Sequence, residues 1–122
     1  MAAPNLVNVS SIYGKTMGAA LGTTTTTSLL ANSAGSNKLL KINSIIVSNV
    51  DGSSAATTTV SWYDGTTDYR LASTVTIPAN STLVLLGKDA PIYMEEGHSI
   101  RGGASAASDL EIVISYEELD DA

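Results

Sequence analysis

Apolar and polar residues alternate along two long stretches of the chain, residues 68–77 and 110–118. This period of two is typical of β-strands, because successive side chains of a strand point to opposite faces. One face is predicted to point inward, and its members are Tyr69, Leu71, Val75, Ile77, Leu110, Ile112, Ile114 and Tyr116. The opposite, outward face is predicted to hold Arg70, Ala72, Thr74, Thr76, Glu111, Val113, Ser115 and Glu117. A helix over residues 106–119 is the alternative, but strict alternation and an Ile-Val-Ile run favour a strand.

Shorter patterns predict further strands at residues 6–12, 21–31, 39–49, 57–63, 82–86 and 91–94, with another starting at residue 99. The inward parity changes between Ile42 and Ile45, which predicts a β-bulge. Residues 82–86 are apolar on both faces and are expected to form the most buried strand. The Asp64-Gly65 pair indicates a hairpin turn, and Trp62 is predicted at the centre of the core because the chain has no Phe. About eight or nine short strands separated by turn signals predict an all-β fold, a single antiparallel β-sandwich or jelly-roll-like domain.

The 122 residues suffice for one domain with one core. We predict an N-terminal arm or edge strand over residues 1–18, the β-sandwich domain over 19–119 and an acidic tail over 120–122. Residues 2–15 are a candidate arm that orders on a partner. The acids near the end, Glu117, Glu118, Asp120 and Asp121, are expected to be solvated, with docking against a basic partner as the alternative.

Composition narrows the functional classes. Charged residues make up only 15% of the chain, against about 25% in an average soluble domain, while Ser and Thr together number 30. The net charge of −6 and the scattered basic residues disfavour a nucleic-acid partner. The absence of cysteine excludes disulfides and thiolate chemistry. The sequence has neither a signal-peptide pattern nor an apolar run of membrane-spanning length, so no membrane association is expected.

Residue types that could carry catalysis are few and poorly grouped. His98 stands beside Ser99 and near Glu95 and Glu96, but neighbouring residues in a strand or tight turn face different ways. The acids in glycine-containing loops read as turn formers rather than calcium ligands, and they are Asp51, Asp64 and Asp68. Gly102-Gly103 lacks the remainder of a phosphate loop. We therefore expect no catalytic residues, no metal, no cofactor and no enzymatic activity.

Binding residues are more plausible than catalytic ones. Tyrosine suits positions where one end of the ring is dry and the other is wet, which includes protein interfaces. The candidate interface residues come from the N-terminal segment, the tyrosines and the acidic end, and they are Asn5, Val7, Val9, Tyr13, Tyr63, Tyr93, Glu117 and Glu118.

The C-terminal half resembles a known class of proteins. The order IPANSTLVLLGKDAPIYMEEGHSIRGGASAASDLEIVISYEE, together with the earlier INSIIVSN, is similar to the small β-sandwich virion proteins of tailed bacteriophages, especially those of cyanobacterial phages. The match spans residues 39–118.

The resemblance implies a capsid decoration or cement protein, made in the host cytoplasm and placed on the outer surface of the phage capsid. Its implied partners are the major capsid protein and further copies of itself, commonly as a homotrimer. The alternatives are a neck, tail or fibre-associated virion protein, or a carbohydrate- or receptor-binding β-sandwich. In the last case sugars would stack on Trp62, Tyr13, Tyr63 or Tyr93.

Overall fold

A computed structural model of the chain describes residues 9–121, and these residues form nine β-strands and no helix. The strands are β1 (Val9–Ala20), β2 (Ser28–Ala31), β3 (Lys38–Asn49), β4 (Ala56–Tyr63), β5 (Asp68–Ile77), β6 (Thr82–Leu86), β7 (Ile92–Met94), β8 (Ser99–Ala104) and β9 (Leu110–Asp121). The all-β prediction is confirmed, although β1, β3 and β9 have 12 residues each and are not short.

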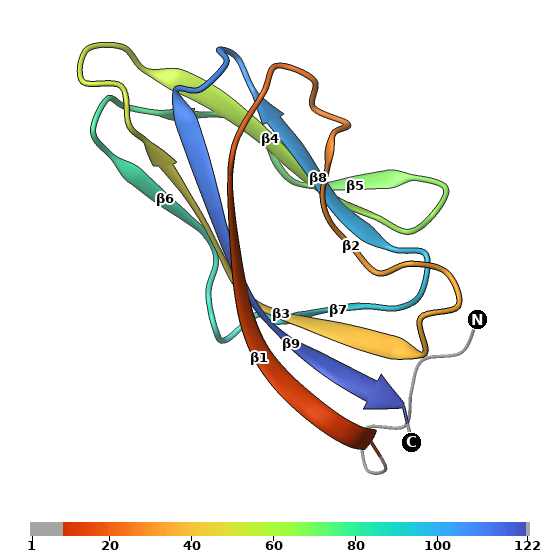
Figure 1. Cartoon of the computed structure of the whole chain (residues 1–122). Helices are drawn as coiled ribbons and strands as arrows, with labels where there is room; N and C mark the ends of the chain where they lie inside the picture. The colour runs from red at the N-terminus through yellow and green to blue at the C-terminus, as the bar shows by residue number, and fades with distance from the viewer. Residues whose placement is uncertain (1–8, 122) are drawn as a thin grey trace.

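The strands form two antiparallel sheets that pack face to face as a β-sandwich (Figure 1). The five-stranded sheet has the order β1-β9-β3-β6, with β7 also paired to β3, and is called the large sheet below. The four-stranded sheet has the order β2-β8-β4-β5 and is called the small sheet. The last strand, β9, therefore lies between β1 and β3, which come much earlier in the chain.

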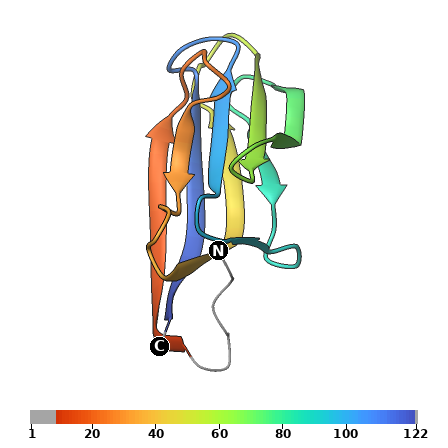
Figure 2. The ribbon, with the colours of Figure 1, turned by 90° about the vertical axis from the view of Figure 1, so that its right-hand side faces the viewer.

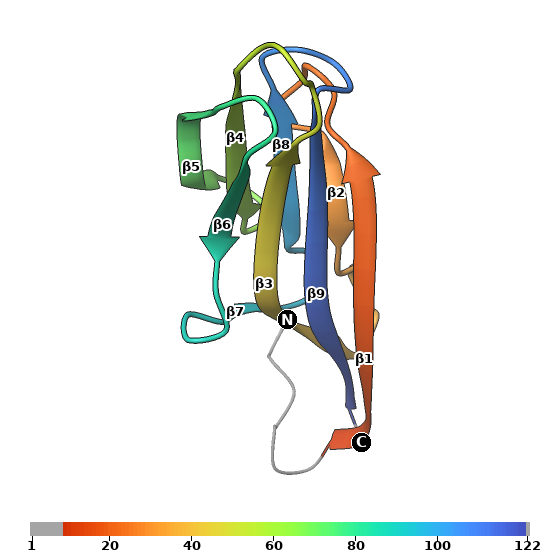
Figure 3. The same cartoon turned by 90° about the vertical axis from the view of Figure 1, so that its left-hand side faces the viewer.

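The large sheet is longer than the small one. Figures 2 and 3 show that β1 and β9 continue past the ends of β2 and β8. We call this projecting part of β1 and β9 the overhang. Its register runs from Val9 opposite Asp121 to Lys15 opposite Tyr116. Residues 9–15 of the predicted arm thus belong to an edge strand, and the rest of that arm lies outside the described residues.

The core between the sheets is aliphatic. Its fully buried side chains come mainly from alternate positions of β3 and β9, and include Ile42, Ile45, Val47, Leu110, Ile112 and Ile114. This confirms the inward face predicted for the first part of β9. Trp62 is only half-buried and packs against the edge of this cluster, so its predicted central place is wrong. It lies near the end of β4, next to the hairpin turn that connects β4 to β5.

Two strands carry irregularities that change which residues face inward. On β3 the register with β9 shifts between Ile42 and Ser44, which confirms the predicted bulge. On β5 the pairing with β4 shifts twice, and Thr74 has a φ of 53°. The simple alternation predicted for β5 is therefore wrong in the first part of the strand, where Ala72 is buried and Tyr69 is 53% exposed. Ile77 at its end is buried as predicted.

Two further strand predictions need correction. Residues 22–27 form a loop instead of the first part of a strand, and this loop packs across Gly103 of β8. Its backbone is held by hydrogen bonds that Gly102 N donates to Thr27 O (3.0 Å) and Ala104 N to Gly22 O (2.8 Å). β6 is an edge strand of the large sheet and not the most buried one, since Val84 is 63% exposed.

Two buried asparagines fix the loops that surround the core. Asn32 Nδ2 donates to Lys38 O (2.8 Å) and to Met94 O (2.9 Å). Asn49 Nδ2 donates to Ser54 O (3.0 Å) and to Ile77 O (2.9 Å). Each amide therefore joins the backbone carbonyls of two separate segments, and these hydrogen bonds are how a buried polar side chain is tolerated.

Candidate interaction surface

The outer face of the large sheet carries an apolar row that crosses four strands. Val84 of β6 pairs with Ile46 of β3, Ile46 pairs with Val113 of β9, and Val113 pairs with Gly18 of β1. We call these four residues the outer row. Val84 is 63% and Val113 41% exposed, and residues 9–121 place no further layer over this side of the sheet (Figure 3). The outer row is thus an exposed apolar strip.

Uncharged hydroxyl groups flank the outer row on both sides. On one side Ser115 pairs with both Ser44 and Thr16, and the hydroxyls of Thr16 and Ser115 are 3.3 Å apart. On the other side the hydroxyls of Ser48 and Thr82 are 3.2 Å apart, and exposed Glu111 of β9 pairs with Ser48. These hydroxyls already bond one another, so covering them removes fewer bonds to water than covering charged groups does. The surface is therefore suited to burial against a partner.

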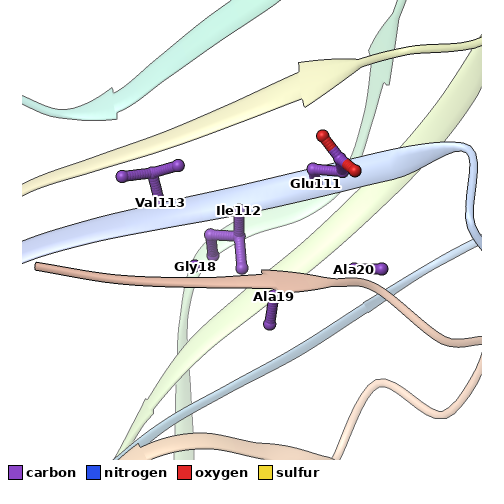
Figure 4. A pocket seen from close by; sticks show the side chains of 6 residues that line it. All are labelled: Gly18, Ala19, Ala20, Glu111, Ile112 and Val113. Carbon is purple, nitrogen blue, oxygen red and sulfur yellow. The ribbon is translucent and has the colours of Figure 1, made fainter.

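A shallow hollow of about 350 Å³ lies at one end of the outer row (Figure 4). It is lined by the end of β1 and the start of β9, namely Gly18, Ala19, Ala20, Glu111, Ile112 and Val113. Three of the six are glycine or alanine, so the hollow exists because β1 ends in small side chains.

The overhang holds a cluster of ion pairs. Glu118 Oε2 lies 3.2 Å from Lys15 Nζ and 3.3 Å from Lys38 Nζ, and Lys38 Nζ lies 3.9 Å from Asp120 Oδ1. Burial alone would raise the pKa of Glu118, but hydrogen bonds and charge attraction from the two lysines outweigh it and lower that pKa. The hydrogen bond to Glu118 likewise raises the pKa of Lys15. Glu118 is therefore a paired strand residue and not part of a solvated tail.

The structure brings several predicted interface residues together at this end. Tyr13 pairs with Glu118 across β1 and β9, and is 50% exposed. Glu117 pairs with Lys41 of β3, with 3.8 Å between their charged atoms, and Lys41 pairs in turn with exposed Tyr93 of β7. Half-buried Val9 starts the same edge of β1. Asn5 and Val7 lie outside the described residues.

Tyr63 lies elsewhere, on the small sheet. Its hydroxyl donates to Gly65 O (3.0 Å), and the Arg101 guanidinium carbon lies 3.6 Å from the centre of its ring. Arg101 Nη1 also donates to Asp68 Oδ2 at 2.9 Å. One face of Tyr63 is therefore occupied by an internal cation–π contact.

His98 and the acids near it have structural contacts. His98 Nδ1 accepts a hydrogen bond from Glu95 N (3.1 Å), and its ring meets Trp62 edge-on at 5.2 Å. Glu96 accepts hydrogen bonds from the backbone N–H groups of Gly35 and Asn37, both at 2.9 Å. Glu96 therefore holds the turn at residues 33–37, and His98 holds the turn that precedes β8.

The loop aspartates are engaged locally as well. Asp64 Oδ1 accepts from Thr66 N (2.9 Å) and Thr67 N (2.7 Å), and these hydrogen bonds lower the pKa of Asp64. The backbone and side chain of Ser53 lower the pKa of Asp51 in the same way. Both acids form turns as predicted, whereas Asp68 is an ion-pair partner of Arg101. Across residues 9–121, no group of three or more His, Asp or Glu residues is placed to bind a metal ion.

The outer row was not among the predicted interface residues. Val113 was assigned outward from the alternation of its own strand, but the row needs the order of four strands, which local patterns do not contain. A signal was present in β6, because a strand that is apolar on both faces must place some apolar side chains on the outside if one of its faces meets solvent.

No helix in the described part of the chain is long and apolar enough to cross a membrane. Comparison with known proteins finds no matching protein-family model and no matching curated protein.

Proposed function

We propose that this protein is a non-enzymatic structural component of a bacteriophage virion, a decoration protein that binds the outer surface of the capsid through the outer face of its large sheet. The observation that carries the proposal is the outer row: an exposed apolar strip across four strands, bordered by hydroxyls, with Glu111 as the charged side chain next to it. The resemblance of residues 39–118 to small β-sandwich virion proteins is the reason for proposing that the partner surface belongs to a phage particle.

The physical argument concerns what the face can bind. Isolated exposed apolar residues are ordinary on protein surfaces, but a contiguous strip indicates a surface that a partner covers. The face of a sheet is flat, which suits a broad protein surface better than a small molecule. The partner on this proposal is the major capsid protein, and many copies on one shell let a modest contact per copy stabilise the whole particle.

The charges of the molecule fit the outside of a shell. The net charge of −6 disfavours contact with the packaged genome. Four of the six basic side chains also have internal partners: Lys15, Lys38, Lys41 and Arg101 form ion pairs, and Arg101 also stacks on Tyr63. Arg70 and Lys88 form no ion pair within residues 9–121, so little positive charge is available to bind phosphates.

The test uses bare capsids of the parent phage and purified protein. We expect Val113→Asp and Val84→Asp to abolish binding to the capsid in a co-sedimentation assay, because each buries a charge in the contact. Thr76→Asp is the matched control, since Thr76 is exposed but lies on β5 of the small sheet, and it should bind like the unaltered protein. Circular dichroism checks that all three variants are folded.

Cryo-electron microscopy of the intact particle then locates the protein. Density for the sandwich on the head, with the large sheet toward the shell, is the expected result. Density on the neck, tail or a fibre would assign the protein to that alternative. Full binding by both aspartate variants would refute the use of the outer row.

One observation favours a second function, recognition of a carbohydrate. Tyr69 is 53% exposed and stacks on Trp62, with 5.7 Å between ring centres, which gives an aromatic platform of the kind sugars stack on. Binding on a glycan array that disappears in Tyr69→Ala, and persists in Tyr93→Ala, would support this function. No binding on such an array would remove it.

A further inference from the structure

The sandwich has four sheet edges, and three of them are shortened or distorted. β2 has four residues, β6 has five and the neighbouring β7 has three. β5 is longer, but two register shifts and the positive φ of Thr74 break its line of backbone groups. Short strands and bulges are the usual devices that prevent one sheet from pairing with another. The fourth edge, β1, is different.

β1 is a long, regular edge strand. It pairs only with β9 among the described strands, and its register is continuous from Ser11 to Ala20. It contains no proline, and its single charged side chain, Lys15, is turned toward Glu118 of β9. Ile12 and Tyr13 are 57% and 50% exposed, on opposite faces of the strand. The outer edge of β1 is therefore a template for another strand.

We propose that β1 pairs antiparallel with β1 of a second copy of this chain, across a two-fold axis at Thr16. Such an axis, perpendicular to the sheet, places inward residues opposite inward residues and outward residues opposite outward ones. The facing pairs are then Thr16 with Thr16, Lys15 with Met17, Gly14 with Gly18, Tyr13 with Ala19 and Ile12 with Ala20. Two large sheets become one continuous sheet.

The side chains of β1 select this register and this partner. Before Thr16 the strand carries its bulky residues, and after Gly18 it ends in Ala19 and Ala20. Antiparallel self-pairing therefore sets a large side chain against a small one at both ends. An axis at Lys15 would instead put two ammonium groups opposite each other, which is unfavourable.

The hollow supports the same arrangement. It lies beside Gly18, Ala19 and Ala20, and these are the residues that face Gly14, Tyr13 and Ile12 of the second copy. The exposed Ile12 and Tyr13 of one copy thus reach the hollow of the other, twice in each dimer. The pairing also keeps both outer rows on one side of the joined sheet, so that both could meet the same flat partner.

The test exploits the absence of cysteine in this chain. Facing residues of an antiparallel pair have Cα atoms roughly 4.5–5.5 Å apart, which is within disulfide range. We expect Thr16→Cys to form a covalent dimer under mild oxidation. Ser115→Cys is the matched control: Ser115 is the neighbour of Thr16 on β9, and about three strand spacings, roughly 14 Å, would separate two copies of it. It should remain unlinked.

Sedimentation provides the second measurement. The unaltered chain should sediment as a dimer at micromolar concentration, and Thr16→Glu should weaken the dimer at least about tenfold, because two carboxylates face each other across the axis. A monomer, or a trimer unaffected by Thr16→Glu, would overturn the proposal, as would equal cross-linking of the two cysteine variants. Thr16→Cys kept reduced should still dimerise, which would show that the charge of the glutamate, and not merely a change at Thr16, weakens the dimer. None of these outcomes bears on capsid binding, which is tested through Val84 and Val113.

Discussion

Replacement of Gly103 by alanine tests the packing of the loop at residues 22–27 against β8. A Cβ atom at this position would lie 2.7 Å from Thr24 O, 2.9 Å from Thr24 C and 3.0 Å from Gly22 O. Ordinary carbon–oxygen contacts are about 3.3–3.6 Å, so the loop must move by several tenths of an ångström. The atoms in the way belong to backbone and cannot swing aside as a side chain would.

Two opposing effects set the size of the change. Alanine restricts the unfolded chain, which by itself stabilises a compatible site by about 0.4–1 kcal/mol. Against this, overpacking typically costs about 1–3 kcal/mol. Displacing the loop also strains the hydrogen bond from Ala104 N to Gly22 O, and such a bond is worth about 0.5–1.5 kcal/mol. We expect a net loss of about 2 kcal/mol in the free energy of unfolding.

Urea unfolding followed by the fluorescence of Trp62, the single tryptophan, measures this loss. For an m-value of about 2 kcal/mol/M, the midpoint should fall by about 1 M. Gly87→Ala is the control, because no atom lies within 4 Å of its added Cβ, and its midpoint should barely move. All samples need equal protein concentration, since self-association shifts apparent stability. A Gly103→Ala midpoint equal to or above that of Gly87→Ala would refute the packing argument.

Three other predictions concern the core, the overhang and the hairpin. Ile114→Ala should cost about 2–5 kcal/mol of unfolding free energy in the same urea assay, because the Ile114 side chain is fully buried. Val113→Ala, at the adjacent position on the outer face, should cost under about 1 kcal/mol. Similar losses for the two variants would contradict the faces assigned to these residues. Because folding lowers the pKa of Glu118, the stability that its ion pairs contribute to the fold is present above the unfolded pKa and is lost as pH falls through the folded pKa. The difference in Tm between the unaltered chain and Glu118→Gln should therefore be greatest near neutral pH and shrink in acid, and a constant difference would count against the ion pairs. Gly65→Ala should lower the free energy of unfolding by about 1–2 kcal/mol, because Gly65 has a φ of 94° and a residue with a Cβ atom adopts such a φ only at a cost. Gly87→Ala again provides the reference. Equal urea midpoints for the two variants would show that the hairpin can relax.

The sequence predicted best where one face of a strand is buried in an unbroken run. Leu110, Ile112 and Ile114 are fully buried as expected, and the parity change between Ile42 and Ile45 located a real bulge. The alternation of β5 failed because Thr74 and two register shifts interrupt the period, and nothing in the string STVTI marks that interruption. Local periodicity therefore predicts inward faces only between irregularities.

Local sequence patterns could not predict the position that each strand takes within its sheet. Residues 82–86 are apolar enough for a central strand, yet β6 lies at an edge because strand order depends on long-range pairing. The five consecutive threonines favour a strand by propensity, but residues 23–27 cross from one sheet to the other and stay a loop. The pairing of Tyr13 with Glu118 has the same origin, since these residues meet only when the first and last strands join.

The placement of β9 between β1 and β3 has a consequence for how the chain folds during synthesis. The large sheet cannot close before residue 110 and those after it are available, because both neighbours of β9 precede it in the chain. Such long-range pairing slows folding and leaves strand edges exposed in the meantime. A nascent chain halted before β9 would present β1 and one side of β3 unpaired, so β9 acts as the closing strand that ends the period in which this protein is prone to aggregate.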